Sequence, residues 1–280
     1  PQPQYVVDGD GSGGPNRFGT VQAAINEVEQ SGDAGAVIGI EAGKGYTSGD
    51  LRDDSTGITI GESLTLIGFS GDGNNTTTPT LDATELNSTG GAINIQADDV
   101  TLRNLAVEYD SSSTDNAVEV QSGNDLSNVT IDGLDITNTA TPGGGGVAAI
   151  NLESQTNATV KNNQIDGGAI GISFKGDVTG SGTINVTGNS IDANDGNEQG
   201  SVTEGIYIFG DLSSKDIQVE NNQVADSGVG SRDIKIGSGG STLAKSVNGQ
   251  TNKQDQLESI LVENNIVSAR VNNGSASDGT

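Results

Sequence analysis

Apolar and polar residues alternate in a five-residue segment that occurs seven times along the chain. The first and third residues are apolar, the second and fourth are polar or variable, and the fifth is Gly or Asn. The segments are Leu64–Gly68, Val100–Asn104, Val129–Gly133, Ala158–Asn162, Ile184–Gly188, Ile217–Asn221 and Ile260–Asn264. Such alternation predicts a half-buried β-strand. Gly or Asn at a fixed place predicts a bend with positive φ, because these two residues tolerate that conformation best.

Two further strands accompany most of these segments. The third residue after the bend is Val or Ile in every repeat but the first, namely Val107, Ile136, Ile165, Ile191, Val224 and Val267. Another strand precedes most segments, and its copies are Ala92–Ile95, Ala117–Val120, Ala149–Leu152, Gly171–Phe174, Gly205–Ile208 and Asp233–Ile236. The repeats are unevenly spaced, which suits a solenoid whose loops differ in length.

Each repeat therefore reads as strand, short loop, strand, bend, strand. This order resembles the right-handed parallel β-helix of the pectin lyase-like superfamily, in which inward residues stack into aliphatic ladders. Nearly all inward residues here are Ile, Val or Leu. We expect an all-β chain with one β-helix domain over residues 1–271 and a polar tail or linker over 272–280. The alternative, an antiparallel β-sandwich, requires hairpin turns between consecutive strands.

One amphipathic helix is expected over residues 20–31, between Thr20 as N-cap and Gly32 as stop signal. Its apolar stripe comprises Val21, Ala24, Ile25 and Val28. A helix there would cover the open end of the solenoid, where unpaired strand edges invite aggregation. The segments Tyr5–Gly14 and Phe18–Asn26 resemble the start of pectin methylesterases and of many other β-helical surface proteins. This resemblance supports the fold and leaves the activity open.

Acidic residues dominate the charge, with 38 Asp and Glu against 12 Lys and Arg and a net charge of −26. Such a surface argues against nucleic-acid binding, which needs Lys and Arg against phosphates. Dense Asp with little Lys resembles the proteins of extremely halophilic archaea, and a generic acidic secreted bacterial protein is the alternative. No apolar run reaches the ~18 residues that a transmembrane helix needs.

Seven Asn-x-Ser/Thr sequons favour an exported glycoprotein, extracellular or on the cell surface. They lie at Asn74, Asn75, Asn87, Asn128, Asn157, Asn185 and Asn273. Asn128 and Asn157 immediately precede a predicted strand and Asn185 points outward from one, so their glycans would project into solvent. Chance occurrence in a chain rich in Asn, Ser and Thr is the alternative. The opening residues 1–4 lack an initiator Met, which indicates a processed or trimmed form.

The residue types exclude several kinds of site. The chain contains no His, Cys or Trp, which excludes imidazole and thiolate catalysis, zinc and copper centres, and the usual sugar-stacking platform. Oxygen ligands remain, and two acidic Gly-rich loops have the character of Ca²⁺ loops. Their candidate ligands are Asp8, Asp10, Asp192 and Asp195. Neither loop completes the EF-hand pattern, and ordinary turn chemistry is the alternative.

The strands that precede the segments predict two outward rows when their inward residues are aligned. The rows are Asn94, Glu119, Asn151, Ser173, Tyr207, Lys235 and Gln96, Gln121, Glu153, Lys175, Phe209, Gly237. A binding patch on this face combines Tyr207, Phe209, Lys175, Lys235 and Arg232. It predicts contact with a surface glycan, another surface protein or a second copy. The alternative is that the long insertion at 238–258 folds over the rings.

The enzymes of the resembled superfamily use motifs that this chain lacks. Asn116–Gln121 only loosely resembles the Gln-Ala-Val-Ala-Leu-Arg motif of pectin methylesterases, and the Gly-His-Gly motif of polygalacturonases needs His. Glu119 and Glu153 are candidates for a carboxylate pair, although in so acidic a chain a solvated face is the alternative. We expect no catalytic residues, no cofactor beyond Ca²⁺, and a non-enzymatic structural or adhesive surface protein. A carbohydrate-active enzyme and a β-helical carbohydrate-binding module are the alternatives.

Salt should stabilise the fold, because screening weakens the mutual repulsion of 38 acidic side chains. The midpoint of thermal unfolding should rise steeply from low to molar salt. Melting curves across a NaCl series measure this, and a parallel series with chelator separates any effect of Ca²⁺. A midpoint that salt leaves unchanged would remove the halophile interpretation.

Overall fold

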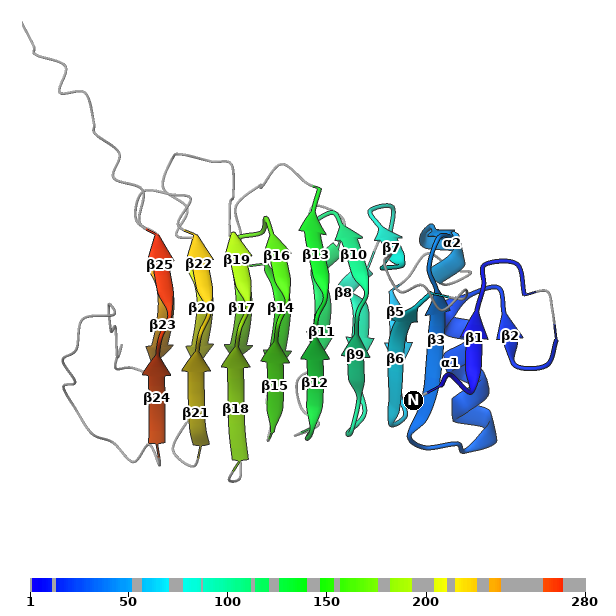
Figure 1. Cartoon of the computed structure of the whole chain (residues 1–280), viewed down its shortest axis with the longest axis horizontal. Helices are drawn as coiled ribbons and strands as arrows, with labels where there is room; N and C mark the ends of the chain where they lie inside the picture. Colours follow the sequence, from blue (N-terminus) through cyan, green and yellow to red (C-terminus); the bar gives the residue numbers. More distant parts are fainter. Residues whose placement is uncertain are drawn as a thin grey trace, which may run out of the picture.

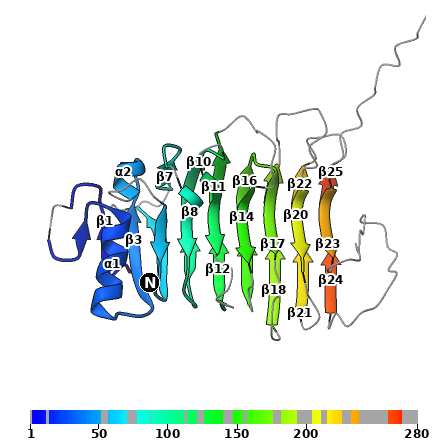
Figure 2. The same cartoon turned by 180° about the vertical axis from the view of Figure 1, so that it is seen from behind.

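Three parallel sheets run along a solenoid, and successive turns of the chain lie side by side (Figure 1). Figure 2 shows the same order of turns from behind. The computed structural model describes residues 2–11, 14–51, 57–70, 78–86, 88–111, 114–120, 126–139, 147–153, 157–175, 182–192, 204–210, 215–225, 232–237 and 259–268. Within these ranges all strand pairs are parallel. The predicted parallel β-helix is confirmed.

Each sheet collects equivalent strands from successive turns. Sheet A comprises β2 (Arg17–Phe18), β1 (Tyr5–Val7), β3 (Ala36–Glu41), β6 (Leu64–Phe69), β9 (Thr101–Arg103), β12 (Val129–Asp132), β15 (Ala158–Lys161), β18 (Gly182–Thr187), β21 (Lys215–Glu220) and β24 (Ser259–Glu263). Sheet B comprises β4 (Gly45–Tyr46), β7 (Thr80–Ala83), β10 (Ala106–Tyr109), β13 (Asp135–Asn138), β16 (Gln164–Asp166), β19 (Ser190–Asp192), β22 (Gln223–Ala225) and β25 (Ile266–Ser268). Sheet C comprises β5 (Ile58–Ile60), β8 (Ser88–Ile95), β11 (Thr114–Val120), β14 (Ala148–Glu153), β17 (Ile170–Lys175), β20 (Glu204–Phe209) and β23 (Arg232–Gly237).

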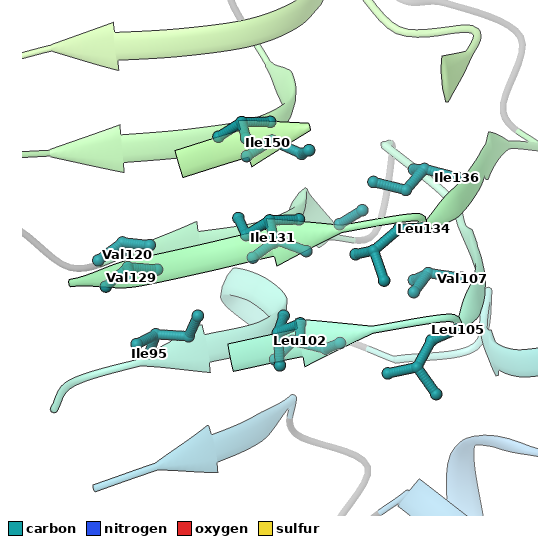
Figure 3. Close-up of a cluster of buried hydrophobic side chains, with 14 of the residues drawn as sticks. Ile95, Leu102, Leu105, Val107, Val120, Val129, Ile131, Leu134, Ile136 and Ile150 are labelled. Carbon is teal, nitrogen blue, oxygen red and sulfur yellow. The ribbon is translucent and has the colours of Figure 1, made fainter. Parts of the chain in front are cut away.

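Inward side chains from the three sheets form one continuous apolar core. Leu102, Ile131 and Val160 are aligned on neighbouring strands of sheet A, and each is fully buried. Figure 3 shows Leu102 and Ile131 together with Ile95 of sheet C and Ile136 of sheet B in this cluster. Burying one such side chain contributes about 1.5–3 kcal/mol. Because no turn covers its own apolar face, neighbouring turns stabilise one another.

A sharp bend joins sheet A to sheet B. Six of the predicted bend residues have a positive φ between 52° and 69°, namely Asn104, Gly133, Asn162, Gly188, Asn221 and Asn264. The prediction was wrong for Gly68, which lies inside β6 and not at a bend. Glycine is needed there for space, because a Cβ on Gly68 would come within 2.0 Å of the Asn104 carbonyl oxygen.

The position after the bend carries a ladder of asparagines that the sequence analysis missed. Its members are Asn163, Asn189, Asn222 and Asn265. From Asn189 onward, each Oδ1 accepts from both the backbone N–H and the Nδ2 of the preceding member, at 2.9–3.0 Å. Each Nδ2 also donates to a sheet A carbonyl of the preceding turn, as Asn189 does to Val160 at 3.0 Å.

This asparagine ladder satisfies polar groups that the bend would otherwise leave unpaired. Asn163, Asn189 and Asn222 are each only 1% exposed, and a buried polar group without a partner costs about 1–3 kcal/mol. A side-chain amide supplies donors and an acceptor together, so one residue type links turn to turn. Leu134 holds this position one turn earlier, where its N–H donates to Asn163 Oδ1 at 2.8 Å.

The first and the last described turns of the solenoid differ. Beside the first turn lies α1 (Val21–Ser31), which confirms the predicted cap: Thr20 accepts from the Ala23 N–H at 3.1 Å and Gly32 ends the helix with a φ of 69°. In the last described turn Val262 is 36% exposed, although Val219, its partner in the preceding turn, is fully buried. A short helix, α2 (Ser48–Leu51), precedes β5. In the described part of the chain, neither helix is long and apolar enough to cross a membrane.

Replacing Asn189 by Ala should lower the free energy of unfolding by about 3 kcal/mol, because two buried donors of Asn163 lose their acceptor. Asn185→Ala is the matched control, since this asparagine points outward from β18 and is partly exposed. Denaturant unfolding of both variants measures the difference. Equal losses in the two variants would contradict the stabilising role of the ladder.

Candidate functional site

The outer face of sheet C carries the residues of the predicted binding patch. The strand register aligns the first predicted row as Asn94, Glu119, Asn151, Ser173, Tyr207 and Lys235. It aligns the second row as Glu153, Lys175, Phe209 and Gly237, while Gln121 lies outside the described residues. Both rows follow from the inward residues alone, because side chains alternate between the faces of a strand.

Three residues of the first row are buried, although the row points outward from sheet C. The exposed fractions are 7% for Asn94, 5% for Asn151 and 0% for Ser173. Asn94 turns its amide back onto its own strand, where Oδ1 accepts from Gly91 N at 2.9 Å and Nδ2 donates to Gly91 O at 2.8 Å. This part of sheet C therefore presents a packed polar layer.

Two amides hold two carboxylates in this layer. Asn116 donates its Nδ2 to Glu119 Oε2 and accepts at Oδ1 from Ala148 N at 3.0 Å. Asn151 Nδ2 lies 3.4 Å from Glu119 Oε2 and 3.3 Å from Glu153 Oε1. One amide nitrogen thus joins the two glutamates that the sequence suggested as a carboxylate pair.

Among the residues that the structure describes, two buried polar atoms on this face have no hydrogen-bond partner. They are Asn151 Oδ1 and Ser173 Oγ, on residues aligned between β14 and β17. An unpaired buried polar atom costs about 1–3 kcal/mol, and folded proteins hold few of them. The hydroxyl of Tyr109 is a third such atom, in the core under sheet B, where burial raises the pKa of that phenol well above its ordinary value.

An aromatic pair lies next to the polar layer. The rings of Tyr207 and Phe209 stack with centroids 5.7 Å apart and planes 17° from parallel, and Phe209 is 37% exposed. Lys175 is aligned with Phe209 on one side and Glu153 on the other. The register also aligns Lys235 with Tyr207 and Arg232 with Glu204. The side chains of Lys235 and Arg232, and the insertion at 238–258, lie outside the described residues.

The first predicted Ca²⁺ loop holds an ion pair. Asp8 is buried, and its Oδ2 accepts from Arg17 Nε at 2.6 Å while its Oδ1 accepts from Gly11 N at 2.8 Å. The hydrogen bond to Asp8 raises the pKa of the Arg17 guanidinium. Asp10 is exposed, as is Asp192 in the second loop. Asp195 lies outside the described residues, which contain no group of three or more metal-ligating side chains.

Three sequons fall in the described part of the chain, all beside sheet A. Asn128 is exposed, and its Nδ2 donates to Asp99 Oδ1 at 2.8 Å. Asn157 accepts from Thr183 N at 2.9 Å. Asn185 points outward from β18. The other four, Asn74, Asn75, Asn87 and Asn273, lie outside the described residues.

The outer face of sheet A holds a charged cluster that the sequence analysis missed. Arg103 Nε and Lys161 Nζ each lie 3.6 Å from Asp132 Oδ2, and Asn162 donates to Asp132 Oδ1 at 2.9 Å. The cluster could have been predicted from the sequence, because Arg103, Asp132 and Lys161 each occupy the fourth position of the alternating five-residue segment. Arg103 is exposed and Lys161 is partly exposed, whereas Asp132 is only 8% exposed. Because both cations remain in contact with solvent, which screens their charge, each pair contributes only about 0–1 kcal/mol.

Comparison of the chain with known proteins and protein families identifies one family that matches it. No curated protein matches the chain, and no solved structure matches it. A family model described as "Protein of unknown function (DUF1565)" matches residues 99–273, which is more than half of the chain. These residues include the asparagine ladder and the outer face of sheet C from β11 to β23. The chain therefore belongs to the DUF1565 family.

Proposed function

We propose that this chain is a non-enzymatic, exported structural or adhesive surface protein that makes contact through the outer face of sheet C. The stacked pair of Tyr207 and Phe209 carries the proposal. The chain has only four Tyr and four Phe, and two of these rings stand together on the outside of one strand. Exposed aromatic residues are enriched where proteins contact their partners. The partner is a surface glycan, another surface protein or a second copy.

The scaffold suits recognition by contact. Side chains on paired strands are held more firmly than side chains on loops, and neighbouring strands lie about 4.8 Å apart. Tyr207 and Phe209 therefore stand on a firm surface beside the packed polar layer of Asn151 and Ser173. A glycan chain or a second flat face can lie against this aromatic pair without a deep pocket.

A carbohydrate-active enzyme is the second candidate, favoured by the convergence of Glu119 and Glu153 on the Asn151 amide. Acid–base turnover needs a proton donor and a base beside an electrophilic or oxyanion partner. The amides of Asn116 and Asn151 instead hold the carboxylates as hydrogen-bond acceptors. This arrangement favours a carbohydrate-binding role over hydrolysis or lysis.

The proposed location follows from charge and sequons. A net charge of −26 suits a high-salt environment, where screening is strong. Glycans on Asn128, Asn157 or Asn185 would extend from the sheet A side. They would leave the outer face of sheet C free for contact, as a surface glycoprotein requires.

Replacing Tyr207 and Phe209 together by Ala should weaken adhesion or assembly, because the exposed aromatic surface is lost, and should leave the melting curve nearly unchanged. Leu261→Ala is the matched control, since Leu261 on β24 is also 37% exposed but belongs to sheet A. Binding to a glycan array and sedimentation velocity measure adhesion and self-association.

Two outcomes would contradict the proposal. One is unchanged binding and assembly in the aromatic variant together with a loss in Leu261→Ala. The other is turnover of a uronic-acid polymer that disappears in Glu153→Gln, which would favour the enzyme.

A further inference from the structure

We infer that copies of this chain associate side by side, with the outer face of sheet A of one copy against the outer face of sheet B of the next. The inference goes beyond the proposed function and does not rest on it, because it uses no residue of sheet C. It is carried by two rows of side chains with complementary charge, one on each sheet, in the same three turns.

The row on sheet A alternates in charge and is called the cationic row. It consists of Arg103 on β9, Asp132 on β12 and Lys161 on β15, which the strand register aligns. Arg103 Nε and Lys161 Nζ share one carboxylate oxygen, Asp132 Oδ2, so the row carries more positive than negative charge. The two cationic side chains are 50% and 38% exposed. Because Arg and Lys each carry several N–H donors, both cations can bind a second carboxylate.

The row on sheet B has the complementary pattern and is called the acidic row. It consists of Glu108 on β10, Thr137 on β13 and Asp166 on β16, which are again aligned by the register. Glu108 and Asp166 are exposed, and Thr137 is partly exposed. In the part of the chain that the structure describes, neither carboxylate forms an ion pair. The acidic row therefore presents two carboxylates that a second copy can neutralise.

The two rows belong to the same turns, as Figure 1 shows for β9 and β10, β12 and β13, and β15 and β16. Only two residues separate the strands of each pair, so no insertion stands between the two faces at this bend. Each row has one residue per turn, about 4.8 Å from the next. The spacing of the cations on one copy therefore equals the spacing of the carboxylates on another.

The rows fit one another when Asp132 of one copy faces Thr137 of the other. Each cation then faces a carboxylate, and the threonine hydroxyl can donate to the Asp132 carboxylate. For copies that run in the same direction, the facing pairs are Arg103 with Glu108, Asp132 with Thr137, and Lys161 with Asp166. Reversing one copy exchanges the two carboxylates and preserves the fit. A shift by one turn places Asp132 against a carboxylate of the other copy, where like charges repel, so the pattern sets the register.

A row of threonines next to the cationic row extends the contact surface. The register aligns Thr65, Thr101, Thr130 and Thr159 on sheet A, and all four are partly exposed. Threonine has few side-chain rotamers, so little conformational freedom is lost when a partner covers it. Its methyl group and its hydroxyl offer apolar contact and hydrogen bonds beside the ion pairs.

Sedimentation velocity of the full chain without attached glycans, in high salt, measures this association. High salt is needed because copies with a net charge of −26 repel one another at long range, and salt screens this repulsion more than it screens pairs in close contact. Glu108→Lys with Asp166→Lys, the sheet B variant, should weaken the association at least about tenfold. The reason is that each cation of one copy then faces a cation of the other.

Glu27→Lys with Glu62→Lys is the matched control. Both glutamates are exposed, one on α1 and the other just before β6. Their replacement changes the net charge by the same amount as in the sheet B variant. Because less negative copies repel one another less, the control should associate at least as tightly as the unchanged chain. An equal loss of association in the control would overturn the inference.

A second variant reverses the charges of the cationic row and keeps their alternation, by Arg103→Glu, Asp132→Lys and Lys161→Glu. Alone it should not associate, because carboxylates then face carboxylates. Mixed with the sheet B variant it should associate about as tightly as the unchanged chain, since a reversed sheet A meets a reversed sheet B. A mixture that stays monomeric would contradict the inference. Should this triple variant melt early, Arg103→Gln with Lys161→Gln replaces it and should weaken self-association by itself.

The failures of the two proposals can be told apart. If the sheet B variant associates as tightly as the unchanged chain and the aromatic variant does not, copies meet through sheet C, and the inference is wrong while the proposed function stands. If the sheet B variant loses association, and the aromatic variant changes neither glycan binding nor assembly, the inference stands and the proposed function is wrong. A chain that stays monomeric at millimolar concentration in high salt also overturns the inference.

Discussion

Each turn of this chain must place its backbone N–H and C=O groups opposite those of the next turn, so that hydrogen bonds form between the two turns. Parallel strands can form hydrogen bonds on both sides only if this condition holds in all three sheets at once. The bend between sheets A and B is where the chain meets it. A residue with positive φ sets the direction of the turn, and the asparagine after it ties the backbone to the next turn. The connections between the other strands do not have to meet this condition, so the number of residues in them can differ from turn to turn.

The sequence predicted the repeating part of the fold because that part follows short-range rules. Alternation identified the strands of sheet A, and the fixed Gly or Asn identified their bends. The first turns were harder to predict, since β4, β5 and β7 contain few residues and lack the repeated pattern. The asparagine ladder was missed because its role appears only when turns are stacked: Asn163 and Asn189 are far apart in sequence and bonded in space. Gly68 shows the same limit, since its need for space comes from Asn104 in the following turn.

The strand register of the candidate site could be predicted from the sequence, whereas the burial and the partners of its side chains could not. Strand alternation was sufficient to place Tyr207 beside Ser173 and Phe209 beside Lys175. Burial could not be predicted from one strand at a time, and Asn151 and Ser173, which alternation places on the outer face, are covered. The Asp8 loop had the composition of a Ca²⁺ site, but Arg17 comes close to its carboxylate only through the pairing of β1 with β2. In these cases the structure differs from the expectation because the residues lie next to partners that are far away in the sequence.

The helix α1 packs on the first turns of the solenoid through its buried apolar stripe. In a solenoid each turn is stabilised by its nearest neighbours. Among the described residues, every strand of sheet A from β3 to β21 has a partner strand on both sides. These turns are therefore expected to keep their structure longest under heat or load, and the turns that carry Ser173 and Tyr207 are among them.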